Sequence, residues 1–130
     1  MRLRGRAISK GRGEGEALVS SEPISFLGGV EAKTGVVVEK GHPLEGKCIA
    51  GKVLVFPRGK GSTVGSYVMY QLAKNGVAPA AIVNERAEII VAVGAIVAGI
   101  PMVDGLQAGK FRDGELLRVD GSAGLVEKSD

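Results

Sequence analysis

The loop at residues 57–62 gathers side chains suited to holding an anion. Arg58 and Lys60 supply positive charge, and Gly61 would let a ligand approach the backbone closely. Ser62 stands where a helix is expected to begin, and the free N–H groups and dipole of a helix N-terminus favour negative charge. We therefore expect this loop to contact a carboxylate or phosphate through Arg58, Lys60 and Gly61, or to stabilise a deprotonated Ser62.

The same loop departs from the common phosphate-binding and nucleophile motifs. The order Gly59-Lys60-Gly61-Ser62 exchanges the glycine and lysine of a Walker A loop, and Gly65 lies one residue too far along for the dinucleotide fingerprint. A nucleophile elbow would need Gly-x-Ser-x-Gly. Ser62 is thus either a helix cap or a base. The two roles are compatible, because N–H groups that bond a capping oxygen also stabilise an alkoxide.

Other polar residues have less distinctive settings. His42 is the single histidine, and its neighbours place it in a turn. Asn84, Glu85 and Asp104 follow expected strands, where each would contact substrate or cap a turn. Cys48 is the single cysteine, and we expect it to be a small buried hydrophobe. One thiol forms no internal disulfide and holds no zinc or iron–sulfur site alone, so no metal is expected in this chain.

Length and composition indicate one domain over residues 1–130. Hydrophobic residues make up 45%, charged residues 24%, and the net charge is +3. The basic N-terminal residues favour a solvated strand face over a nucleic-acid interface, because aromatics are only 4%. The start lacks the apolar core of a signal peptide, and the apolar stretch at 89–103 is too short to span a bilayer. We expect a cytoplasmic protein.

Periodicity predicts strands in the first half and alternating strands and helices in the second. The first helix would run from a cap at Ser62 to Lys74, with a stripe of Val64, Val68 and Leu72 and a stop at Asn75-Gly76. The second, apolar nearly all round, would be buried. The expected strands are 3–8, 16–20, 35–38, 53–56, 80–83, 100–103, 115–119 and 124–127, with the second helix at 87–98.

The predicted fold class is α/β. The β-α-β-α-β order implies parallel strands joined by right-handed crossovers, and the last two strands a hairpin. A β-barrel-like half would surround this small parallel layer. Ligands collect beyond the carboxyl ends of parallel strands in such layers, which places residues 57–62, Asn84 and Asp104 at one edge.

Several stretches, in order, resemble the small subunit of the aconitase X family. The main one runs from Gly46 to Tyr67 and contains Val53-Leu54-Val55-Phe56-Pro57-Arg58-Gly59-Lys60-Gly61-Ser62-Thr63-Val64-Gly65. Further matching pieces are Gly15-Glu16-Ala17-Leu18-Val19, Ser25-Phe26-Leu27-Gly28-Gly29, His42-Pro43-Leu44 and Ala78-Pro79-Ala80-Ala81-Ile82-Val83-Asn84. The resemblance covers roughly Leu3 to Glu127. The Gly-x-Gly-Ser core alone is weakly specific, and the ordered series carries the likeness.

This resemblance implies an aconitase-like swivelling β/β/α fold and a hydro-lyase that is active only with its large subunit. It implies dehydration of (R)-5-phosphomevalonate to trans-anhydromevalonate 5-phosphate in an archaeal mevalonate pathway. It also implies a [4Fe-4S] cluster with one iron open to the substrate. With one cysteine here, the cluster is expected in the large subunit. The proton acceptor of the family falls on Ser62; the roles of Arg58 and Lys60 rest on electrostatics alone.

Two other functions stay open at this point, besides an aconitase X dehydratase for a hydroxyproline-type substrate. The tail Val119-Asp120-Gly121-Ser122-Ala123-Gly124-Leu125-Val126 resembles the terminal hairpin of phosphohistidine domains. A phosphotransfer domain needs a histidine at a helix start, where this chain has Ser62. A basic nucleic-acid-binding module is the other alternative, and a steep salt dependence of binding would support it.

Overall fold

The computed structural model describes residues 1–129. Strands and helices follow each other much as the periodicity predicts. The strands are β1 (Arg2–Arg4), β2 (Arg6–Ser9), β3 (Arg12–Val19), β4 (Val53–Phe56), β5 (Ala81–Asn84), β6 (Met102–Asp104), β7 (Leu116–Asp120) and β8 (Leu125–Lys128). The helices are α1 (Phe26–Gly29), α2 (Gly65–Lys74) and α3 (Ile89–Ala98), with a 3-10 turn, η1, at Ala108–Lys110.

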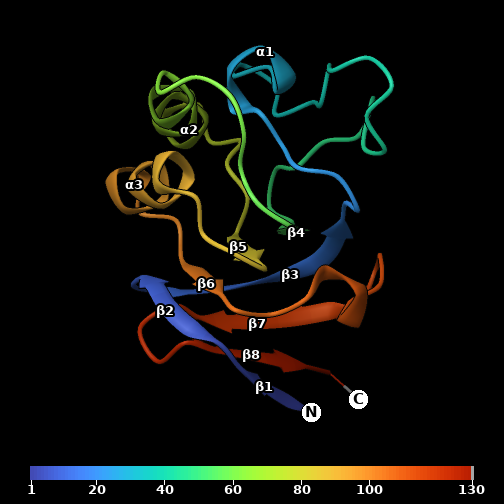
Figure 1. Cartoon of the computed structure of the whole chain (residues 1–130), viewed down its shortest axis with the longest axis vertical. Helices are drawn as coiled ribbons and strands as arrows, with labels where there is room; N and C mark the ends of the chain where they lie inside the picture. The colour runs from blue at the N-terminus through green and yellow to red at the C-terminus, as the bar shows by residue number, and fades with distance from the viewer. Residues whose placement is uncertain (130) are drawn as a thin grey trace.

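The elements form three layers, which agrees with the expected β/β/α fold. Helices α1, α2 and α3 cover one face of the parallel strands, and β7, β8 and β1 lie on the other side (Figure 1). Strands β4, β5 and β6 are parallel neighbours joined through α2 and α3, as the β-α-β-α-β order requires. Strand β3 adds a fourth parallel member, which the sequence did not indicate.

The sheet closes on itself into the barrel-like half. Its strand order is β1-β8-β7-β3-β4-β5-β6-β2, so the two edge strands are consecutive in the chain and only Gly5 separates them. The expected single strand at residues 3–8 is therefore wrong. Its two halves pair with β8 and β6, at opposite ends of the sheet order. Strand β3 also contributes to both parts of the sheet, because its first half pairs with β7 and its second half with β4.

Two hydrophobic cores lie on opposite faces of the parallel strands. Alternation along β4 sends Val53 and Val55 into the barrel and Leu54 and Phe56 under the helices, and all four are fully buried. This explains the continuous apolar run in the sequence, because a strand covered on both faces has no polar side.

Several local expectations differ from the structure. Residues 35–38 form no strand; Val36 and Val37 make only isolated bridges. Helix α2 begins at Gly65 with Val64 in the cap position, so Ser62 precedes the helix by one short turn. Val64 is exposed and does not belong to the buried stripe, which consists of Gly65, Val68, Met69 and Leu72. The stop at Asn75-Gly76 is confirmed, with Gly76 at φ 72°.

Helix α3 is not the buried helix that its composition predicts. Only Val91, Gly94 and Ala95 are buried, whereas Ile89, with 72% of its surface exposed, faces outward. One side of the helix packs against α2, and the opposite side has no layer above it in the described residues. Among residues 1–129, no helix is long and apolar enough to cross a membrane.

Candidate functional site

The carboxyl ends of β4, β5 and β6 meet at one edge of the sheet, as parallel strands require. Backbone hydrogen bonds tie these ends together: Glu85 and Arg86 donate their N–H groups to Pro57 O at 3.0 and 3.2 Å, and Gly105 N–H donates to Glu85 O at 3.0 Å. The loop that follows β4, residues 57–64, is thus held at its base. Ile24 fixes its middle, by donating to Arg58 O and accepting from Lys60 N–H.

Ser62 lies exposed in the turn between this loop and α2. Its Oγ accepts the N–H of Val64 at 3.1 Å, and its carbonyl accepts the N–H of Gly65 at 3.0 Å. Ser62 therefore caps the turn that leads into α2 and not the helix itself. The hydroxyl proton of Ser62 has no acceptor among the described residues, whereas Ser25 and Ser66 donate theirs to backbone carbonyls.

The two glycines of the loop, Gly59 and Gly61, make room for neighbouring protein atoms. A Cβ on Gly59 would lie 2.3 Å from Val91 of α3. A Cβ on Gly61 would lie 2.5 Å from the Ser25 hydroxyl, and Gly61 also has φ 98°, a backbone conformation that favours glycine. The glycines let the loop fold tightly against its neighbours, and that packing places Ser62 on the surface. A substrate contact by Gly61 stays a prediction.

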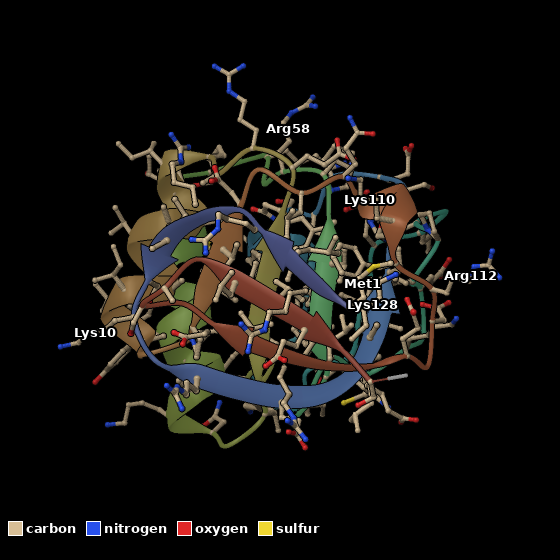
Figure 2. All side chains as sticks on the ribbon, turned by 90° about the horizontal axis from the view of Figure 1, so that it is seen from below. Met1, Lys10, Arg58, Lys110, Arg112 and Lys128 are labelled. Atoms are coloured by element: carbon tan, nitrogen blue, oxygen red, sulfur yellow. The ribbon has the colours of Figure 1, made fainter. Side chains whose placement is uncertain are left out.

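The two cations of the loop are not equivalent. Lys60 Nζ pairs with the carboxylate of Glu39 at 3.2 Å, so a neighbouring negative charge balances its positive charge. Arg58 projects away from the body of the molecule (Figure 2) and makes no ion pair within residues 1–129. Arg58 is therefore the cation of this loop that is free to bind an anion. Substrate binding by either residue stays a prediction.

Asn84 is completely buried and supports the loop from below. Its Nδ2 donates to Phe56 O at 3.0 Å, directly before Pro57, and to Val83 O at 3.2 Å. Its Oδ1 has no hydrogen-bond partner in the described structure. Because no part of Asn84 reaches the surface, its role here is to hold the end of β4 and not to contact substrate. Glu85 also acts on the backbone, accepting the N–H of Ala108 at 2.9 Å.

Asp104 belongs to an ion pair at the end of β6. Its side chain is only 2% exposed, and its oxygens accept hydrogen bonds from Arg6 Nε at 2.9 Å, Arg6 Nη2 at 2.7 Å and Ala87 N–H at 2.8 Å. Burial raises the pKa of this carboxyl group, but the bonds from Arg6 and Ala87 lower it by more, so the net pKa is below its usual range. Asp104 therefore joins β2 to the start of α3 and is structural.

We expect Asp104→Asn to lower the free energy of unfolding at neutral pH by about 1.5–3 kcal/mol, because it removes charged hydrogen bonds in a buried setting. Since the pKa of Asp104 is lower in the folded state, its stabilisation is complete above the unfolded pKa of about 4. It is lost as pH falls through the folded pKa. Urea unfolding at pH values near 7 and near 3 measures both effects.

Glu127→Gln is the matched control for this experiment. Glu127 pairs with Arg2 at 3.4 Å on the surface, where such a pair contributes about 0–1 kcal/mol. Equal losses of stability in the two variants would show that the burial of Asp104 has no energetic consequence.

The single histidine and the single cysteine lie outside this loop. His42 is buried in a turn, as expected: its Nδ1 accepts the N–H of Leu44 at 3.0 Å and its Nε2 donates to Pro23 O at 3.0 Å. Both ring nitrogens are thus occupied by backbone, which leaves no free nitrogen for phosphotransfer. Cys48 is exposed and donates to Thr34 O, so the expectation that it is buried is wrong. The irregular segment between α1 and β4 leaves it at the surface.

Comparison with known proteins identifies the family of this chain. A sequence model of the aconitase X swivel domain matches residues 2–128. The chain belongs to the aconitase X swivel domain family. A relative in Methanocella arvoryzae is 60% identical over 99% of this chain and 100% of its own length, and one in Thermococcus onnurineus is 58% identical over 98% of both. Both relatives are named phosphomevalonate dehydratase small subunit.

Two solved structures share the aconitase X swivel fold with this chain. The crystal structure of Thermococcus kodakaraensis aconitase X in its holo form matches with a TM-score of 0.98 at 54% identity, covering 100% of this chain and 99% of that one. A solution NMR structure of a UPF0107 protein matches with a TM-score of 0.91 at 48% identity, covering both chains completely. The predicted fold class is therefore confirmed.

This aconitase X swivel domain has further residues at the site that the sequence analysis missed. Ser25 lies against Gly61, and Glu39 neutralises Lys60. Ser25 was part of a matching stretch but had no assigned role, and no periodic signal marks Glu39 in its irregular segment. Tyr67 and Tyr70 stack one turn apart at a ring-centroid distance of 6.3 Å on the exposed side of α2. Their three-residue spacing could have indicated a shared face.

Proposed function

We propose that this chain is the small subunit of a phosphomevalonate dehydratase, a hydro-lyase that works only when a larger subunit joins it. The names of relatives 58–60% identical over nearly the whole of both chains support this proposal. We also propose that residues 1–130 act as one swivelling unit in the cytoplasm, that Ser62 is the proton acceptor, and that the larger subunit holds the [4Fe-4S] cluster.

The free hydroxyl of Ser62 is the observation that supports its role best. Its Oγ already accepts the N–H of Val64, and that donor favours an alkoxide over a hydroxyl. The unpaired charge of Arg58 in the same loop acts in the same direction. Ser25 and Ser66 are weaker candidates, because each donates its proton to a backbone carbonyl.

The role of this chain in the proposed reaction is to remove one proton from the substrate. In the ionised form, Ser62 Oγ takes a proton from C2 of the 3-hydroxy acid and becomes a hydroxyl. The electrons of the C–H bond form the C2–C3 double bond as the C3–O bond breaks and the hydroxyl group leaves as hydroxide. The proton that Ser62 took up balances this hydroxide, so that the net products are the alkene and water and Ser62 is ionised again. A positioned base typically contributes about 100- to 10,000-fold to such a step.

The exposure of Ser62 to solvent is a reason why the large subunit would be needed for catalysis. In contact with bulk water a serine stays protonated, and its alkoxide gains little from the neighbouring N–H and cation. When the large subunit closes over the loop, it excludes water and strengthens both interactions. Arg58 would then meet the carboxylate or phosphate of the substrate, with Lys60 and Gly61 as further contacts.

The residues of this chain do not fit a cubane cluster. Cys48 is its only cysteine, and such clusters are held by several thiolates. Residues 1–129 contain no group of three or more His, Cys, Asp or Glu side chains that could hold a metal ion. This arrangement supports the proposal that the cluster belongs to the larger subunit.

A comparison of two substrates in the assembled enzyme tests the proposed function. We expect the complex of this chain with its large subunit, reconstituted anaerobically, to convert (R)-5-phosphomevalonate to the anhydro product, as followed by ³¹P NMR and mass spectrometry. A hydroxyproline-type substrate should react at least about 100-fold more slowly, because it offers no phosphate to the cationic loop. The reverse preference would assign the chain to a hydroxyproline-type dehydratase.

A further inference from the structure

Helices α2 and α3 present an apolar surface that no part of the described chain covers. Of the eleven large hydrophobic side chains exposed in residues 1–129, seven lie on these helices or directly before α2. We call this surface the helical face. Its members are Val64, Tyr67, Tyr70, Ile89, Val93, Ile96 and Val97.

The spacing of these residues makes the helical face continuous. Ile89, Val93 and Ile96 recur at i, i+4 and i+7 and form one stripe along α3. Helices α2 and α3 pack closely, because Gly94 lies against Met69 and Ser66. A groove of about 290 Å³, lined by Ser66, Tyr67, Tyr70 and Val97, joins the outer sides of the two helices.

Charge is nearly absent from the helical face and abundant on the opposite side of the molecule. Helix α3 has no charged residue, and Lys74 is the only one in α2. The outer strands instead carry ion pairs, including Arg118 with Glu14 and Arg12 with Asp120. Figure 2 shows the same division, with nitrogen- and oxygen-tipped side chains over the strands in front and carbon-only side chains projecting beyond α3. Large exposed apolar surfaces of this kind mark interaction sites.

The helical face begins at the Ser62 turn itself. Val64 is 47% exposed, and its N–H is the group that bonds Ser62 Oγ. A partner that covers Ser62 therefore has the exposed Val64 directly beside it, and Tyr67 lies one turn further along, in α2. Under the proposed function, on which this inference rests, the body that covers Ser62 is the large subunit.

We propose that the helical face of α2 and α3 is the surface through which this chain docks onto the large subunit of the enzyme. The matching surface of that subunit is apolar and poor in charge, with hydrogen-bond acceptors at its margin for the hydroxyls of Tyr67 and Tyr70. Tyrosine is enriched in such interfaces. The swivelling unit is thus held by its helices at one side of the Ser62 turn, and its charged strand layer stays in water.

A second copy of this chain fits the helical face less well. In a two-fold dimer the same patch meets itself, so another copy of α2 and α3 would lie beside each Ser62 turn. That copy would bring no metal-binding group, since residues 1–129 contain no suitable cluster of side chains. The catalytic arrangement would then lack the groups that the dehydration requires, whereas the large subunit supplies them.

Binding of Ile96→Lys to the reconstituted large subunit tests this proposal. Ile96 is 58% exposed in the last turn of α3, where a lysine complements the helix dipole and leaves the fold intact. We expect the dissociation constant measured by calorimetry to rise at least about 30-fold, the effect of a central interface residue. Tyr67→Ala, a truncation on the same surface, should weaken binding in the same direction and serves if the lysine variant unfolds.

Leu116→Lys is the matched control, because Leu116 is an exposed apolar residue of β7 outside the helical face. Its dissociation constant should stay within about threefold of the unmodified chain. Unchanged binding by both Ile96→Lys and Tyr67→Ala would overturn the proposal. So would a self-associated chain that Ile96→Lys dissociates while large-subunit affinity is unaltered, since the occupant would then be a second copy.

The binding measurement separates this inference from the proposed function. A complex that forms through the helical face but leaves phosphomevalonate unchanged supports the docking surface and refutes the substrate. An active complex whose affinity is insensitive to Ile96→Lys and Tyr67→Ala supports the function and refutes the docking surface.

Discussion

Turnover of the assembled two-chain enzyme is expected to fall by about 100- to 10,000-fold in Ser62→Ala, because the proton acceptor is lost. The fold should survive, since Ser62 Oγ accepts a single N–H, from Val64, in an exposed turn. Loss of such a capping bond costs about 0.5–2 kcal/mol at most, which a domain of this size tolerates. Steady-state dehydration rates and thermal melting of the same complex distinguish the two consequences.

The neighbouring hydroxyls provide the controls for Ser62. Ser66→Ala removes a hydroxyl one turn further along, whose proton is already donated to Thr63 O. Thr63→Val removes the hydroxyl next to Ser62, which makes no hydrogen bond within residues 1–129. Both variants should keep rates within about tenfold of the unmodified enzyme. Near-normal turnover in folded, partner-bound Ser62→Ala would show that Ser62 is not the base, which would then have to lie in the large subunit.

Activity is expected to be absent from the isolated chain, which should be folded and colourless. The chain has one cysteine and no metal-binding cluster within residues 1–129, and its proposed base faces water. Anaerobic iron–sulfur reconstitution together with the large subunit should give a brown complex that dehydrates phosphomevalonate. Absorbance near the cluster bands and product formation, measured on the chain alone and on the complex, check both parts.

Cys48→Ser is the matched control for the location of the cluster. Cys48 is exposed and bonds only Thr34 O, so its replacement should leave the colour and the rate of the complex unchanged. Loss of colour in this variant would show that Cys48 is a cluster ligand. Dehydration by the isolated chain would refute the two-subunit mechanism altogether.

Burial of the catalytic loop by the large subunit is also expected to appear in hydrogen exchange. The backbone N–H groups of residues 57–66 should exchange more slowly in the complex, and those of α3 should follow if the helical face is the docking surface. Protection confined to the β7–β8 hairpin would contradict both placements.

The parallel half of the fold could be predicted because its signals are local. The continuous run Val53–Phe56 indicates a strand buried on both faces, and Asn75-Gly76 provides a helix stop that depends only on backbone conformation. Strand ends in such a layer must share an edge, so the position of the candidate site followed from the element order. The single cysteine likewise excluded a complete cluster site from composition alone.

Long-range contacts decided the remaining features. The break of residues 3–8 at Gly5 depends on the closure of the sheet, which brings together strands about 100 residues apart in sequence. Lys60 finds Glu39 and Asp104 finds Arg6 for the same reason, so neither charge could be judged from its own segment. The exposure of one side of α3 could not be predicted from the sequence either, because an apolar helix is buried only where another layer covers it.

The sequence by itself determined the parallel β-α-β-α-β layer, the edge at which Ser62 lies and the lack of enough thiols for a cluster site. Those properties follow from hydrophobic periodicity, turn residues and the count of thiols, all of which act along the chain. Only the tertiary structure decided that the loop glycines pack against Val91 and Ser25. It also decided that Asn84 is completely buried beneath the loop and that the helices present an apolar face. Each of these depends on which distant segments approach one another, and hydrophobic patterning does not encode that pairing.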